Sequence, residues 1–256
     1  MTAAIDCFVD VSGRRLHYLR AGYGLPLVLL HSNGASAHEF EHVVGPLAKR
    51  ASVHCVDYPG FGDSEALPGR FSIEATTDAI GGFVRSLALD RPVLCGTSIG
   101  GTIAADFASR YPDLIRGVVL VETPCRSWEA WGRIWPVVER LFAIPTQQLD
   151  QIEARFRAAT PELLTRWNID RNKCGGRVMM EAMWAIREFD MRAAAARIDL
   201  PCLLIFGENG AVADGADDLC TSIPSATRVD LADCGHFPMI DDPAAFSAAL
   251  VEFLAR

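Results

Sequence analysis

A serine flanked by glycines is the feature of this 256-residue chain that most directly suggests chemistry. Residues 96–101 read Gly-Thr-Ser-Ile-Gly-Gly, a Gly-x-Ser-x-Gly pattern centred on Ser98. An apolar run precedes the pattern and a helical pattern follows it, which predicts a tight turn that exposes the serine hydroxyl. A serine so placed can be the nucleophile of acyl transfer.

His236 is the histidine best placed to activate that serine. A serine hydroxyl needs a base to take its proton, and the base is usually a histidine. His236 follows the last predicted strand, 227–231, and precedes the final predicted helix, 244–254. Its loop therefore lies at the same edge of the sheet as Ser98, and we predict that His236 is the general base.

Two backbone N–H groups are expected to stabilise the oxyanion that forms during acyl transfer. One comes from Ile99, directly after the serine, and the other from the loop after the apolar run 27–30. That loop reads His-Ser-Asn-Gly over residues 31–34, and Asn33 is the predicted second donor. An ordinary glycine-containing turn would explain this loop equally well when it is taken alone.

Short apolar runs alternate with helical patterns in the rest of the chain. The predicted strands are a hairpin at 8–11 and 16–20 and buried strands at 27–30, 53–56, 93–95, 117–121, 202–206 and 227–231. Strands that alternate with helices predict an α/β fold with a mostly parallel sheet flanked by helices.

Residues 124–196 interrupt this alternation and read as helices. All five tryptophans fall in this interval. We predict a helical cap, 124–196, inserted in a core domain made of 1–123 and 197–256, over the carboxyl ends of the strands where such sheets bind ligands. Most tryptophans are expected in the cap core, while Trp184, with Met180 and Met183, is the preferred pocket candidate.

Composition narrows the classes of partner. The net charge of −8 and the pI of about 5.2 disfavour nucleic acid and anionic membranes. No apolar run reaches the length of a membrane span, and the N-terminus has no signal pattern, so a soluble, cytoplasmic protein is expected. The eight cysteines contain no Cys-x-x-Cys pair and are expected to be reduced thiols that bind no zinc.

Four segments together resemble the α/β-hydrolase superfamily over nearly the whole chain. They are 31–34, 57–64 (Asp-Tyr-Pro-Gly-Phe-Gly-Asp-Ser), 96–101 and 235–238 (Gly-His-Phe-Pro). The resemblance implies a serine hydrolase with no cofactor and no metal. The superfamily often has glycine where this chain has Ser32, so the Ser32 side chain is expected near the oxyanion hole.

The triad acid departs from the commonest pattern of that superfamily. Most relatives carry an aspartate after the strand that matches 202–206, and the corresponding residue here is Gly210. A minority place the acid after the preceding strand, where this chain has Glu122. We therefore predict Glu122 as the acid, with Asp214 as the alternative, and with Asp233 or the lack of an acid as the remaining ones.

This acid position, with a cap rich in tryptophan, resembles the zearalenone-lactonase type of α/β-hydrolase. The resemblance implies a lactone and a binding role for Trp184, and the tryptophans and methionines of the cap suggest a bulky, apolar substrate. The predicted binding residues are Trp184, Met180, Met183, Trp128, Phe237 and Ser32. Carbon–carbon bond hydrolases and enol-lactonases of aromatic degradation are similar alternatives, and a non-catalytic receptor on the same fold is a rival of another class. The serine at position 98 argues against epoxide hydrolases and haloalkane dehalogenases, which use aspartate. The sequence leaves a homodimer open.

A literal His-Glu-x-x-His pattern occurs at residues 38–42. On one helix this pattern presents two histidines to a zinc ion. No further histidine cluster follows that could supply a third ligand. We expect an ordinary solvated start of a helix here.

Overall fold

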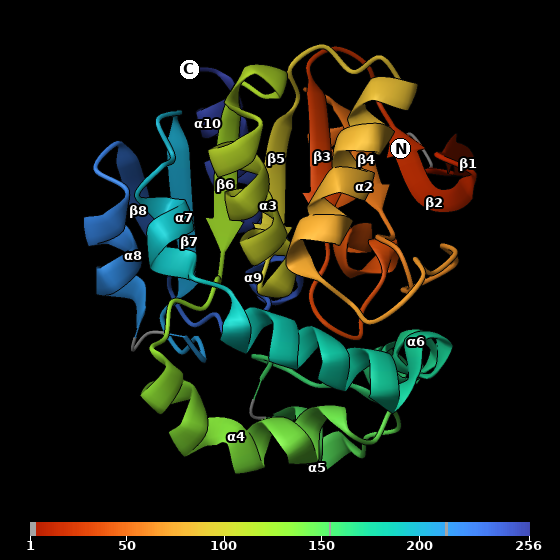
Figure 1. Ribbon diagram of the computed structural model, residues 1–256, viewed down its shortest axis with the longest axis vertical. Coiled ribbons are helices and arrows are strands. Elements are labelled where there is room, and N and C mark those ends of the chain that lie inside the picture. The colour runs from red at the N-terminus through yellow and green to blue at the C-terminus, as the bar shows by residue number, and fades with distance from the viewer. Residues whose placement is uncertain (1–3, 154, 213–214) are drawn as a thin grey trace.

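The centre of the protein is an eight-stranded sheet, seen in a computed structural model that describes residues 4–153, 155–212 and 215–256 (Figure 1). Its strand order is β1-β2-β4-β3-β5-β6-β7-β8. The strands are β1 (Ile5–Val11), β2 (Arg14–Ala21), β3 (Pro26–Leu30), β4 (Ser52–Val56), β5 (Val93–Thr97), β6 (Gly117–Val121), β7 (Cys202–Gly207) and β8 (Ala226–Leu231). β1 and β2 pair antiparallel, as do β2 and β4, and every pair from β4 to β8 is parallel. The predicted mostly parallel sheet is confirmed.

The central strands are parallel because both of their faces are covered by helices. β3, β5, β6 and β7 are continuous apolar runs with almost every residue buried, as such strands require. One face is covered by α2 (Ile73–Ser86), α3 (Ile99–Arg110), α7 (Met191–Ala195) and α8 (Ala216–Ser222). The other is covered by α1 (Glu41–Leu47), α9 (Pro238–Asp241) and α10 (Pro243–Leu254). Two 3₁₀ helices, η1 (Ala37–Phe40) and η2 (Pro112–Leu114), complete these layers.

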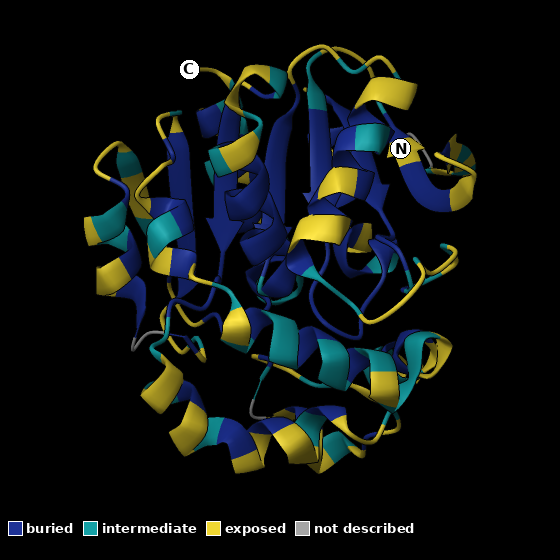
Figure 2. Cartoon of the chain, viewed as in Figure 1, coloured by how far each residue is buried: buried dark blue, intermediate teal, exposed yellow. Residues whose placement is uncertain are grey.

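Three further helices lie across the carboxyl ends of the strands (Figure 1). They are α4 (Trp128–Phe142), α5 (Leu149–Glu153) and α6 (Pro161–Glu188), the last of which kinks at Gly175. Figure 2 shows buried and exposed residues alternating along α4, as expected for a helix with one apolar face. α7 also falls within the predicted cap interval, and it packs against α3. None of the described helices is long and apolar enough to cross a membrane.

A buried arginine ties α6 to the end of α4. The Arg171 side chain is fully buried and donates to the carbonyl oxygens of Leu141, Ile144 and Pro145. These carbonyls belong to the last turn of α4 and the residues after it, where helix geometry leaves acceptors unpaired. The guanidinium therefore closes the helix end and fixes the spacing of the two cap helices.

Candidate active site

Ser98 occupies a sharp turn between β5 and α3. Its backbone has φ 55° and ψ −117°, a region that non-glycine residues rarely adopt and that is associated with functional sites. A Cβ at Gly96 would lie 2.0 Å from the carbonyl oxygen of Gly100, and a Cβ at Gly100 would lie 2.3 Å from that of Leu30. The two glycines are thus required because backbone passes directly against backbone. The serine is left half-buried at the mouth of the turn.

His236 and Glu122 meet beside that turn. His236 Nδ1 lies 2.9 Å from Glu122 Oε2, and the other carboxylate oxygen accepts the N–H of Gly207 at 2.9 Å. Glu122 is fully buried and also has a positive φ of 45°. Its carboxylate can hold the imidazole with Nδ1 protonated, which leaves Nε2 free to accept a proton.

The surroundings of His236 keep the imidazole neutral. Burial lowers the pKa of His236 below its ordinary value, although the hydrogen bond and the charge of Glu122 act in the opposite direction. The positive charges of Arg155 and Arg126 lower this pKa further. The unprotonated form, the one that can act as a base, is therefore the main form at neutral pH.

The carboxylate of Glu122 fills the space beside Gly210. A Cβ at residue 210 would lie 2.0 Å from Glu122 Oε1, so a side chain there would have to displace the carboxylate from this position. The alternative acid Asp214 lies outside the described residues, and Asp233 is exposed. Among the described carboxylates, Glu122 is the one hydrogen-bonded to His236.

The two predicted oxyanion donors follow neighbouring strands. Leu30, at the end of β3, pairs with Gly96 of β5, so the loop of Asn33 and the turn of Ser98 start side by side. The Asn33 N–H has no acceptor among the described residues, and the N–H of Ile99 lies in the first turn of α3, where helix geometry leaves donors unpaired. The Asn33 side chain donates to the carbonyl of Met179 in α6 at 3.0 Å, which joins this loop to the cap.

The side chain of Ser32 faces Glu39 and not the cavity. Ser32 N and Oγ both donate to Glu39 Oε2, at 3.0 and 2.5 Å. Burial raises the pKa of Glu39 to about 7, while the hydrogen bonds from Ser32 oppose that rise. Ser32 directly precedes the predicted donor Asn33, and through its side chain Glu39 holds this loop in place.

The expectation of a solvated helix start at residues 38–42 is wrong for Glu39, which is 5% exposed. The pattern also does not form one helix, since η1 ends at Phe40 and α1 starts at Glu41. His42 is exposed, whereas His38 lies near Ser36, with 3.2 Å between Nδ1 and Oγ. The segment positions a loop through its glutamate, and its spacing does not place two histidines on one helical face.

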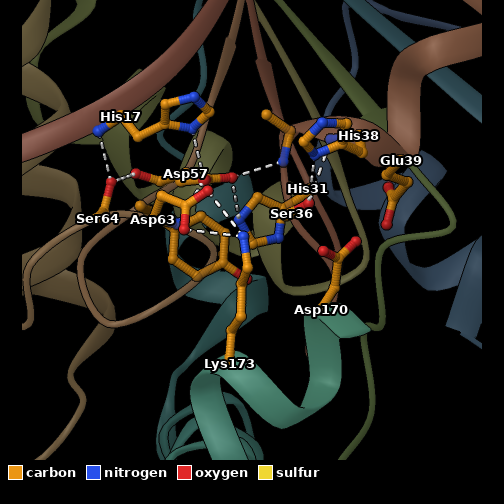
Figure 3. Close-up of polar contacts among 12 residues, drawn as sticks. His17, His31, Ser36, His38, Glu39, Asp57, Asp63, Ser64, Asp170 and Lys173 are labelled. Atoms are coloured by element: carbon orange, nitrogen blue, oxygen red, sulfur yellow. Dashed lines mark hydrogen bonds and ion pairs between the residues drawn. The ribbon is translucent and has the colours of Figure 1, made fainter. Parts of the chain in front are cut away.

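A second buried carboxylate, Asp57, organises the same loops (Figure 3). It accepts the N–H groups of Ala37 at 2.6 Å and Asp63 at 2.8 Å, and it lies 2.8 Å from His17 Nδ1. His17, Asp57 and Asp63 are close enough to hold a cation, but Lys173 Nζ already binds both oxygens of Asp63 at 2.8 Å. The cluster is therefore satisfied by hydrogen bonds and an ion pair that joins α6 to the core.

Ser98 and His236 open into a shared cavity of about 230 Å³. Apolar residues of α4 form much of its wall, Trp131 among them, and Met183 of α6 and Val212 contribute as well. Of the predicted binding residues, Met183 lies in this wall. The wall is apolar, with two arginines in it, Arg126 and Arg155.

The other aromatic and methionine candidates lie outside this wall. Trp184 packs on Trp135 with ring centroids 4.3 Å apart, and Trp128 is 52% exposed with Arg187 over its ring. Phe237 is buried beneath His236 among other rings, and Met180 packs against the core. The sequence did not single out Trp131 and Arg155, which do line the cavity. Helical spacing does not tell which tryptophan points into a cavity, and Arg155 belongs to no recognisable motif.

Comparisons with known proteins agree with this geometry. A profile described as "Alpha/beta hydrolase family" matches residues 27–249. The chain belongs to the alpha/beta hydrolase family. It is 32% identical to a pimeloyl-[acyl-carrier protein] methyl ester esterase of Chromobacterium violaceum, over 91% of this chain and 95% of the relative.

Two solved structures extend the comparison. The enol-lactonase of Burkholderia xenovorans LB400 is 26% identical to this hydrolase, with a TM-score of 0.82 over 98% of this chain and 100% of the other. A thermophilic esterase of Thermogutta terrifontis is 25% identical, with a TM-score of 0.82 over 99% and 98% of the two chains. The predicted superfamily is thus confirmed, whereas the finer resemblance to zearalenone lactonases is not among these findings.

Replacing Glu122 by alanine is expected to lower kcat by about 10³–10⁴, because the imidazole loses the group that fixes its tautomer. Asp214→Ala should change kcat little. Hydrolysis of p-nitrophenyl butyrate by the purified variants measures both. A severe loss in Asp214→Ala with a mild one in Glu122→Ala would transfer the acid role to Asp214.

Moving the carboxylate from residue 122 to residue 210 tests whether side chains at these two positions compete for the same space. Gly210→Asp alone should lower activity and Tm, because its side chain meets Glu122. Adding Glu122→Ala removes that contact and leaves an aspartate in the turn after β7, the strand that pairs with β6, at a spacing of about 5 Å between neighbouring strands. The double variant should be more active than either single one, and an activity at or below the lower single value contradicts the exclusion.

The acid limb of kcat/KM is expected below pH 6.5, since the pKa of His236 is lowered and the base is the unprotonated imidazole. Initial rates between pH 4.5 and 8 on one ester locate the limb. Glu39→Gln is the control variant, because the Glu39 carboxyl has a pKa of about 7 and could otherwise be mistaken for His236 in the pH profile. The Glu39 carboxyl does not contact the imidazole. A limb above 6.5, or one that vanishes in Glu39→Gln, contradicts the assignment to His236.

Proposed function

We propose that this protein is a serine hydrolase that cleaves carboxylic esters through Ser98, His236 and Glu122. Ser98 Oγ attacks the ester carbonyl while His236 Nε2 takes its proton. The same imidazole then gives that proton to the leaving alkoxide, and an acyl-Ser98 intermediate remains. Water, deprotonated by His236, clears the acyl group and regenerates the serine.

Three further groups are proposed to stabilise the charges that form during the reaction and to orient the imidazole of His236. The N–H groups of Asn33 and Ile99 are proposed to bind the oxyanion, and removing one such donor typically lowers the rate by about 10²–10³. Glu122 keeps Nδ1 protonated and stabilises the imidazolium that forms at each step. The observation that carries the proposal is the contact of 2.9 Å between His236 Nδ1 and Glu122 Oε2, together with the position of His236 and Ser98 in the wall of one cavity.

An ester substrate is supported by relatives as well as by the site. The relative from Chromobacterium violaceum is named for a methyl ester, and the solved relative from Thermogutta terrifontis for esterase activity. The apolar wall formed by α4 suits an acyl chain or another apolar group next to the ester. We therefore infer a small, partly apolar ester as the substrate class.

A lactone is the second candidate, and one observation favours it. The structure of an enol-lactonase is 26% identical and aligns with nearly the entire chain. A lactone is an internal ester, so the same steps would open it without releasing a separate alcohol. For a large resorcylic lactone the structural support is weaker, because Trp184, which suggested it, packs on Trp135 outside the cavity wall.

Ser98→Ala is expected to abolish turnover of p-nitrophenyl acetate and butyrate, because no other group supplies the nucleophile. Ser225→Ala, an exposed serine whose hydroxyl donates to the Leu200 carbonyl, is the matched control and should leave kcat/KM within about twofold. An enol-lactone and a saturated lactone complete the substrate panel. Absence of Ser98-dependent turnover across all of them would favour a receptor on this fold over an enzyme.

A further inference from the structure

Arg155 lies partly buried in the wall of the cavity of Ser98 and His236, and no residue that the structure describes supplies a counter-ion for its charge. Its guanidinium makes no hydrogen bond and no ion pair with any residue that the structure describes, and its Nη1 is shielded from solvent without an acceptor. A buried guanidinium ordinarily has its donors satisfied, because desolvated N–H groups without acceptors are destabilising. Arg171 places two of its nitrogens, Nε and Nη2, on carbonyl acceptors, although its Nη1 also lacks a partner among the described residues; the guanidinium of Arg155 has no such acceptor for any of its nitrogens.

Aromatic rings hold the Arg155 guanidinium in place. Its central carbon lies 4.9 Å from the ring centroid of Phe237, 5.3 Å from that of Trp167 and 5.8 Å from that of Phe142. Contacts with ring faces favour a cation but offer its N–H groups few acceptors. The rings therefore set the position of the guanidinium and leave its donors for another group.

The backbone of Arg155 ties this charge to the candidate base. Its carbonyl oxygen accepts the N–H of His236 at 3.2 Å, and Phe237, whose ring lies under the guanidinium, is the next residue of the same loop. A Cβ at Gly235 would lie 2.7 Å from that carbonyl, so the two segments are in direct contact. Arg155 and His236 therefore line the same cavity, and their backbone segments are in direct contact.

The charged groups around Arg155 do not neutralise it. Burial is the main cause that lowers its pKa to about 9, Arg171 acts in the same direction and Glu39 in the opposite one, so the guanidinium stays protonated at neutral pH. Glu39 has a pKa of about 7, raised by burial, and its Oε2 is already bound by Ser32. It is therefore only partly ionised at neutral pH and forms no ion pair with Arg155.

We propose that Arg155 binds a free carboxylate of the substrate, so that the preferred substrates are esters or lactones that also carry a carboxylate group. A carboxylate offers two acceptors in the geometry that a guanidinium matches, and such charge-assisted pairs are stronger than hydrogen bonds between neutral groups. The apolar wall from α4 accommodates the carbon chain between the two functional groups. The charge distribution agrees, since residues 124–196 carry eleven Arg and Lys against nine Asp and Glu in a chain of net charge −8.

This inference rests on the proposed ester hydrolysis, and a matched pair of substrates tests it. Monomethyl adipate carries a carboxylate, and methyl adipamate has a neutral amide of nearly the same shape in its place. The wild-type enzyme should cleave the half-ester with a kcat/KM at least about tenfold higher, as expected when a charge-assisted hydrogen bond is made. The monomethyl esters of succinic and glutaric acid then measure which chain length spans the two groups.

Variants assign the preference to Arg155. Arg155→Gln should lower kcat/KM for the half-ester by about 10- to 100-fold more than for the amide, and Arg155→Lys should be intermediate. Arg157→Gln is the matched control, since Arg157 is exposed two residues further along the same segment. Equal kcat/KM for the two substrates in the wild type, or an equal loss on both in Arg155→Gln, overturns the proposal.

Measuring binding in a variant that cannot turn over the substrate distinguishes the proposed carboxylate site from the proposed hydrolase activity. Ser98→Ala should bind monomethyl adipate in calorimetry, and Ser98→Ala/Arg155→Gln should bind it at least about tenfold more weakly. Arg155-dependent binding without Ser98-dependent turnover would reject the hydrolase and keep the carboxylate site. Ser98-dependent cleavage of neutral esters without Arg155-dependent binding would reject the site and keep the hydrolase.

Discussion

The carboxylate of Glu122 stands where a side chain at residue 210 would have to be, and the rest of the site is arranged around it. One oxygen binds His236 and the other accepts the N–H of Gly207, so both are used by groups from the neighbouring strand and the loop beyond β8. The N–H of Ser98 donates to the carbonyl of Val121, the residue before Glu122, at 2.9 Å. The turn that carries the serine and the strand end that carries the acid are thus joined directly, and both residues hold a positive φ to make this possible.

Two other buried carboxylates stabilise the loops around this centre without entering the cavity wall. Glu39 fixes Ser32, immediately before Asn33, and Asp57 fixes Ala37 and Asp63 in the segments on either side. Burying a carboxylate is unfavourable unless donors surround it, and here backbone N–H groups supply many of them. The cap adds to the same framework through the contacts of Asn33 with Met179 and of Asp63 with Lys173.

Arg171 and Arg155, both in the segment between β6 and β7, have different surroundings. Arg171 is fully buried, and its Nε and Nη2 donate to carbonyls at the end of α4 and just after it, so that it joins two helices. Arg155 is packed against aromatic rings, and the residue forms part of the wall of the cavity that contains Ser98. The difference lies in the acceptors nearby, because a guanidinium in an apolar setting is stabilised only when something accepts its hydrogen bonds.

The order of strands and helices, the parallel sheet and the positions of Ser98 and His236 at its edge followed from the sequence by itself. Apolar runs, helical periodicity and the glycines around Ser98 are properties of short segments, so they can be recognised without knowing what packs against them. Glu122 was predicted because Gly210 lacked a side chain, and the tertiary structure gave the physical reason, which is that the two positions share one space. The direction of Trp184, the burial of Glu39 and the unpaired charge of Arg155 were decided only by the tertiary structure. Each of these depends on contacts between segments far apart in the chain, and no local pattern carries information about such contacts.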